Sequence, residues 1–176
     1  MEYSSVAQCK TATEAIQRVR PGVSLLRDAT LEDLELAKEI MEPLVYRRAR
    51  HVVTENHRTL QAKEYLETGD WKKVGELMNA SHSSMRDDYE VSCEEVDVLV
   101  DIAQNFSSAY GSRLTGGGFG GCTVTLVRQE KAAELMSHLK AQYKIATGGD
   151  CPCFVTRPAR GVHLLSLTDY KPLSQE

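Results

Sequence analysis

Residues 114–127 read LTGGGFGGCTVTLV, and this stretch decides how the rest of the chain is interpreted. Five of the six residues from 116 to 121 are glycine. Glycine costs backbone entropy in a strand or helix, so such a run is typical of a sharp turn or a close approach to a ligand. The flanking residues, Ala109 to Thr115 and Cys122 to Val127, favour strands. The pattern predicts a glycine-rich loop that joins two strands.

The position between two strands argues against three common phosphate-binding motifs. Gly116, Gly118 and Gly121 have the spacing of a dinucleotide fingerprint, but that motif requires a helix directly after the glycines. A Walker loop ends in G-K-[ST], whereas Cys122 and Thr123 follow here. The chain also lacks the V-A-I-K, H-R-D and D-F-G motifs of protein kinases. Free N–H groups in such a loop still favour phosphate, and a packing loop without a ligand is the alternative.

Three segments resemble the GHMP small-molecule kinases, and among them the galactokinases. Residues 113–124 (RLTGGGFGGCTV) resemble the third, C-terminal motif of that family. Residues 77–93 (LMNASHSSMRDDYEVSC) and 46–52 (YRRARHV) resemble the galactokinase segments that precede the motif. The likeness covers nearly the whole chain in the family's order. It implies that residues 1–176 are a ferredoxin-like GHMP kinase C-terminal domain, and that the N-terminal, ATP-binding half is absent.

Capping residues and apolar periodicity predict helices through the first two thirds of the chain. Residues 4–19 form one expected helix, and Thr30 with Asp33 form a capping pair for another. A long helix is expected from Pro43 to about Leu66, ended by Gly69. Two further N-terminal caps are predicted at Asp70 and, as a capping box with Glu95, at Ser92.

The last third changes to a mixed pattern. A helix is expected from about Glu130 to Tyr143, with apolar residues on one side. Strands are expected at Phe154 to Arg157 and Val162 to Leu167, paired across residues 158–161. Together with the strands around the glycine loop, this predicts an α+β fold, a small antiparallel sheet packed against several helices.

Composition bounds the function classes. The chain has 176 residues, 41% hydrophobic and 26% charged, which suits one globular domain. A net charge of -4 argues against nucleic-acid binding, and no apolar run is long enough to cross a membrane. The five cysteines are irregularly spaced, which favours reduced thiols and a cytoplasmic location.

The resemblance also implies site residues. Tyr3 corresponds to a galactose-binding tyrosine that precedes a helix with a cysteine, here Cys9, and a frayed terminal residue is the alternative. No residue of this chain matches a catalytic group or a metal ligand. The backbone expected to approach the nucleotide phosphates, or to support the missing ATP loop, belongs to Gly116, Gly117, Gly118, Gly120 and Gly121.

Other polar residues have a structural interpretation in preference to a chemical one. His82 falls on an apolar helix stripe and is predicted to be a core histidine, and Asp87 with Asp88 is expected at the surface. Cys151 and Cys153 lack the spacing of a zinc site. A basic cluster is expected to pair with acids or to solvate a helix face; it contains Arg47, Arg48, Arg50 and His51.

The implied activity is that of a galactokinase, the ATP-dependent phosphorylation of galactose at its anomeric hydroxyl. The sugar motif, the ATP and magnesium loop and the catalytic aspartate and arginine of that family have no match here. Because phosphoryl transfer depends on positioning and charge stabilisation, the isolated chain is predicted to be inactive, with the Mg²⁺ ligands in the absent half. A fragment of an N-acetylgalactosamine kinase and a non-catalytic sugar- or nucleotide-binding module are the alternatives, although Gly118 and Phe119 fit galactokinase better.

Overall fold

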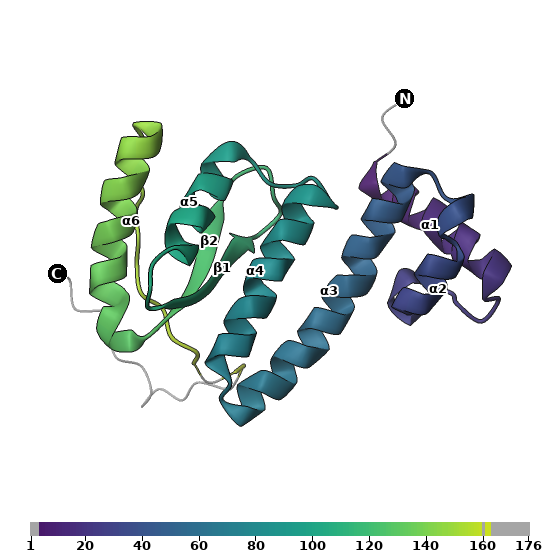
Figure 1. Cartoon of the computed structure of the whole chain (residues 1–176), viewed down its shortest axis with the longest axis horizontal. Coiled ribbons are helices and arrows are strands. Elements are labelled where there is room, and N and C mark those ends of the chain that lie inside the picture. Colours follow the sequence, from purple (N-terminus) through teal and green to yellow (C-terminus); the bar gives the residue numbers. More distant parts are fainter. Residues whose placement is uncertain (1–3, 160, 163–176) are drawn as a thin grey trace.

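The computed structural model describes residues 4–159, 161 and 162. Six α-helices and one two-stranded sheet occupy this part of the chain, and Figure 1 shows their arrangement. The helices are α1 (Ser5–Val19), α2 (Leu31–Leu36), α3 (Pro43–Thr68), α4 (Trp71–Asp87), α5 (Glu94–Gln104) and α6 (Ala132–Thr147). The strands are β1 (Ala109–Thr115) and β2 (Cys122–Val127). Single-turn 3₁₀ helices are η1 (Leu26–Asp28), η2 (Lys38–Ile40) and η3 (Gln129–Lys131).

The two strands around the glycine loop are confirmed with the predicted bounds. β1 and β2 pair in antiparallel fashion, and Thr115 faces Cys122 at the end where the loop begins and ends. The hydroxyl groups of Ser112 and Thr125 lie 2.9 Å apart across the ladder. With helices packed around this small sheet, the α+β class predicted from the sequence is confirmed.

The helices on the N-terminal side of the described residues share an apolar cluster of their own. α1, α2 and the first half of α3 lie together at one end of the molecule in Figure 1. They share an apolar cluster that consists of Ala12, Ile16, Val23, Leu26, Leu34, Ala37, Val45 and Ala49. α3 is 26 residues long, so it continues beyond this cluster and runs beside α4 in the α/β part. A single helix therefore links the two parts.

Local chemistry fixes most helix ends as predicted. Pro43 is at the first position of α3, and Gly69 ends that helix in a left-handed conformation with φ 73°. Asp70 caps α4 by accepting the Lys73 N–H at 3.1 Å. Thr30 caps α2, and its capping box is complete.

Two predicted features are wrong. Ser92 does not cap α5; Cys93 holds the cap position without a side-chain bond, because the Ser92 hydroxyl donates to Asp97 instead at 2.5 Å. Residues 154–157 are not a strand in the structure, since Phe154 and Val155 are both exposed and this segment has no buried face to place on the sheet. The partner strand predicted at 162–167 falls on residues outside the described ones, apart from Val162.

α4 and β1 approach each other more closely than side chains would allow. A Cβ atom at Gly111 would lie 2.6 Å from the Cα of Gly75 and would overlap the Gly75 carbonyl. A Cβ atom at Gly75 would overlap the carbonyl group of Tyr110 in the same way. Because both contacts are with backbone, neighbouring side chains cannot relieve them by changing rotamer. The packing of the sheet on α4 therefore requires glycine at both positions.

We predict that Gly111→Ala lowers the free energy of unfolding by about 1–3 kcal/mol, because the added methyl group must push β1 away from α4. Urea unfolding followed by circular dichroism measures this change. Gly22→Ala is the matched control, since a Cβ there meets no atom within 4 Å; we expect a change within about 0.5 kcal/mol. Equal stability of the two variants would show that the contact is not constraining.

Candidate functional site

The glycine loop has a backbone that other residues rarely adopt. Positive φ angles occur at Gly116 (95°), Gly118 (90°), Gly120 (119°) and Gly121 (103°). Phe119 is also left-handed, with φ 57°, although it is not a glycine. A non-glycine residue in this region costs about 1–3 kcal/mol unless its surroundings hold it. Four of the five glycines are therefore favoured by the path of the loop, and Gly117 is the exception.

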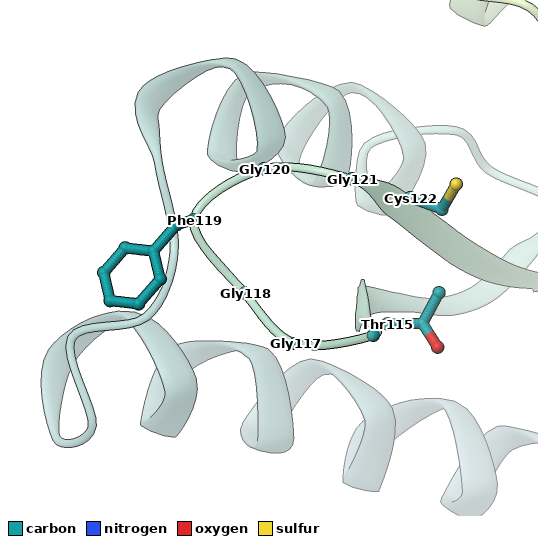
Figure 2. Close-up of a pocket in the computed structure, with 8 residues that line it drawn as sticks. Thr115, Gly117, Gly118, Phe119, Gly120, Gly121 and Cys122 are labelled. Atoms are coloured by element: carbon teal, nitrogen blue, oxygen red, sulfur yellow. The ribbon is translucent and has the colours of Figure 1, made fainter.

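This loop surrounds an open hollow of about 550 Å³, which is lined by residues 115–122. Figure 2 shows the loop as a wide bend between the strand ends, with the Phe119 ring at its apex, pointing away from them. Within the described part of the chain, the N–H groups of Gly116, Gly117 and Gly120 donate to no protein acceptor. None of the lining residues is charged. The residues around the hollow thus carry neutral, unpaired backbone donors, which suit an oxyanion but contribute no counter-charge.

The loop is held against the turn between α4 and α5. The Phe119 N–H donates to the Val91 carbonyl oxygen at 2.6 Å. A Cβ atom at Gly118 would lie 2.6 Å from the same oxygen and 2.8 Å from the Val91 Cβ. At Gly117, by contrast, a Cβ would meet nothing within 4 Å. Gly118 is therefore the glycine at which both conformation and space exclude a side chain.

The turn that carries Val91 is itself fixed by arginines from α3. Glu90 has a positive φ of 55°, and its carboxylate accepts from Arg48 at 2.6 Å and from Arg47 at 2.5 Å. The hydrogen bond from Arg48, followed by the charges of both arginines, lowers the pKa of Glu90. The prediction that this basic cluster pairs with acids is confirmed. These two arginines stabilise the turn on which the loop rests.

Asp88 is buried, although the sequence predicted that it would lie at the surface. Its residue is only 6% exposed, and its carboxylate accepts from Arg50 and from the Ser84 hydroxyl. The prediction of a solvated Asp88 is wrong because this side chain turns back toward α3, where Arg50 lies. Asp87 does lie at the surface, where a hydrogen bond from Arg86 lowers its pKa.

His82 is a buried histidine, as predicted from its place on the apolar stripe of α4. It is 1% exposed, and its Nδ1 accepts the N–H of Leu114 at 3.3 Å, so the ring proton is on Nε2. Nε2 lies 3.1 Å from Asp97 Oδ1 but is poorly aligned for a hydrogen bond. Burial lowers the pKa of His82, which favours the neutral ring. The histidine thereby fixes the end of β1 just before the glycine loop.

The predicted sugar contact and the metal ligands are separate questions from the glycine loop. Tyr3 lies outside the described residues. Among the residues that the structure describes, no group of three or more His, Cys, Asp or Glu side chains could hold a metal ion. The residues that the structure describes therefore do not fit a magnesium site.

The same described portion of the chain contains no helix with the length and apolar character needed to span a bilayer.

Two supports of the loop were missed at the sequence level. Glu90 carries no sign of a left-handed backbone, because that conformation usually indicates Gly, Asn or Asp. Val91 acts through its carbonyl group, which every residue possesses. The nearest available signal was the basic segment 46–52, since so many arginines on one helix require acidic partners.

Comparisons with known proteins agree with this geometry. Residues 62–145 match the family model "GHMP kinases C terminal". Galactokinase from Roseiflexus sp. is 46% identical over 88% of this chain and 40% of its own length. Human galactokinase is 44% identical over 91% of this chain and 38% of its own length. The crystal structure of Lactococcus lactis galactokinase complexed with galactose superposes with a TM-score of 0.77 at 32% identity, over 85% of this chain and 40% of that one.

Residues 62–145 therefore match the C-terminal domain of the GHMP kinases, and the fold and the glycine loop agree with that match. Within that class, the chain is a homologue of the C-terminal part of the galactokinases. It spans about 40% of the length of the galactokinases that it matches.

We predict that Gly118→Ala destabilises the free chain by about 1–3 kcal/mol, because the methyl group would meet Val91 and the backbone would be strained. Gly117→Ala is the matched control one residue away, and its stability is expected to stay within about 0.5 kcal/mol of the parent. Urea unfolding curves compare the three proteins. If Gly118→Ala were as stable as Gly117→Ala, the loop would not be held by the α4–α5 turn.

Proposed function

We propose that residues 1–176 are the C-terminal domain of a galactokinase and act in ATP-dependent phosphorylation of galactose at its anomeric hydroxyl. The observation that carries the proposal is the hollow of unpaired backbone N–H groups in the glycine loop, within a chain that is 44% to 46% identical to galactokinases. Such donors stabilise a phosphate oxygen at fixed positions without reorganising during the reaction. We assign ATP to this loop as the nucleotide.

The chain is proposed to contribute only part of the catalytic machinery. Transfer of a phosphoryl group requires positive charge near the phosphate oxygens and a group that positions the attacking hydroxyl. The hollow has no lysine or arginine in its lining, and Arg113 beside it is directed toward Leu114, Met85 and Glu55. We therefore expect the charged groups and the Mg²⁺ ligands to come from the other part of the enzyme. When bound, that ion would neutralise phosphate charge.

Galactose is the proposed sugar because the relatives are galactokinases and one related structure was crystallised with galactose. N-acetylgalactosamine is the second sugar to be tested, as it differs at one ring substituent. The cytoplasmic location expected from the cysteine usage stays a prediction.

We predict that this chain alone consumes no ATP in response to galactose, and that mixing it with the N-terminal part of a related galactokinase restores galactose-dependent ADP release. A coupled ADP assay measures both, with N-acetylgalactosamine run in parallel. Gly117→Ala should retain the restored rate, whereas Gly118→Val should lose at least tenfold, the effect of about 1.4 kcal/mol on the barrier. Galactose-dependent activity of the chain by itself would contradict the proposal that it contributes only part of the catalytic machinery. Silence of a mixture in which the two parts demonstrably associate would favour a non-catalytic module.

Tyr3 is proposed to contact the sugar. In the assembled enzyme, Tyr3→Phe removes one hydroxyl, so the apparent galactose affinity should fall by about threefold to tenfold, the effect of one neutral hydrogen bond. The apparent ATP affinity should stay unchanged, because the nucleotide is assigned to the glycine loop. Steady-state titration of each substrate distinguishes the two. An unchanged galactose affinity would remove Tyr3 from the site.

A further inference from the structure

Two cysteines that follow α6 lie side by side, away from the glycine loop. The Sγ atoms of Cys151 and Cys153 are 3.5 Å apart, and both thiols are free. The Cys153 thiol also approaches the carbonyl oxygen of Cys151 at 3.4 Å. The two sulfur atoms therefore point to the same side of the chain, with one residue between them.

The surroundings hold this pair in place and leave it reachable. In Figure 1 the segment after α6 turns back and runs alongside that helix. Cys153 packs on the apolar cluster formed by Ala103, Leu135 and Leu139 of α5 and α6. Both cysteines are only partly buried. A small thiol reagent can thus approach from solvent while the fold fixes the backbone.

The geometry is compatible with a bond between the two sulfur atoms. A disulfide requires Cα atoms within about 4.4–6.8 Å of each other. Two residues apart, an extended chain separates Cα atoms by at most about 7 Å, and Pro152 keeps the intervening φ near -65°. The sulfur atoms need to approach by about 1.5 Å to reach the bonded length near 2.05 Å. Rotation of the two side chains is the movement that the proposed bond requires.

A metal site explains the pair less well. Zinc takes four ligands in its structural sites, and no third His, Cys, Asp or Glu joins these two thiols among the described residues. Burial, together with the hydrogen bond to Cys153, raises the pKa of the Cys151 thiol, while the nearby Lys140 charge lowers it. The thiolate form of Cys151 is therefore scarce at neutral pH, so attack by Cys151 is expected to be slow there and faster in alkaline buffer.

We propose that Cys151 and Cys153 are a redox-modification site. A low-molecular-weight disulfide such as oxidised glutathione oxidises the two thiols, and an intramolecular disulfide forms between Cys151 and Cys153. One cysteine thiolate attacks a sulfur of the reagent, forms a mixed disulfide and releases one glutathione thiolate. The second cysteine thiolate then attacks the mixed disulfide and releases the other. The two cysteines lose two electrons, the reagent gains them, and the two cysteine protons end on the released glutathione.

The test is a mass measurement on the full chain. The protein is incubated with oxidised glutathione, free thiols are blocked with N-ethylmaleimide after an acid quench, and the digest is analysed without reduction. We expect the peptide with both cysteines to lack the mass of two hydrogen atoms and to carry no label. Cys9, Cys93 and Cys122 should each carry the label or a single glutathione, and none of them should form an internal disulfide. Separate glutathione adducts on Cys151 and Cys153, full labelling of both after equilibration, or a bond to another cysteine would overturn the proposal.

Single substitutions make the result specific. Cys153→Ser and Cys151→Ser should each abolish the internal disulfide and leave a stable glutathione adduct on the remaining cysteine. Cys122→Ser, at an exposed thiol outside the pair, is the control and should form the internal disulfide to the same extent as the parent. Circular dichroism checks folding, and Cys151→Ser serves as the second variant because Cys153 packs on the core. An internal disulfide that persists in either single variant would refute the assignment.

Discussion

The α/β part depends on how closely the backbone of β1 lies on the backbone of α4. Gly75 and Gly111 meet there without side chains, so the strand is seated directly on the helix. At this separation the N–H of Leu114 reaches Nδ1 of His82, which is buried in α4. The starting point of the glycine loop is therefore set by a contact between two residues that have no side chain. Excess volume at either position would be transmitted along the strand to the loop.

The glycine loop carries neutral backbone donors, whereas the turn that supports it carries the charged side chains. The hollow contains neutral donors, and the charged groups lie behind it, in the pairs that Arg47 and Arg48 form with Glu90. Binding of a phosphate is favoured by oriented dipoles and by positive counter-charge. Arginines that are already paired with a carboxylate supply little of this counter-charge. On the proposed function, this domain supplies the backbone donors of the site, and the positively charged groups are expected from the other part of the enzyme.

Local chemistry explains which features could be predicted from the sequence. Pro43 and Gly69 fix the ends of α3 through their own backbone preferences, so neighbouring residues alone were sufficient. Ser92 has the right spacing for a cap, but Asp97 competes for its hydroxyl after the chain folds. The left-handed backbone of Glu90 depends on arginines more than forty positions earlier. Such features are set by distant partners, which periodicity and capping rules do not contain.

Arg48 of α3 links the amino-terminal helix to the turn that supports the glycine loop. Arg48 is only 7% exposed, and its guanidinium group donates to Gln8 of α1 at 3.2 Å and to Glu90 of the α4–α5 turn at 2.6 Å. A planar group with fixed donor directions holds both partners at one spacing. The amino-terminal helix and the support of the glycine loop are thereby clamped to the same point on α3. A displacement of α1 would therefore be transmitted through Arg48 to Glu90 and to the turn on which the glycine loop rests.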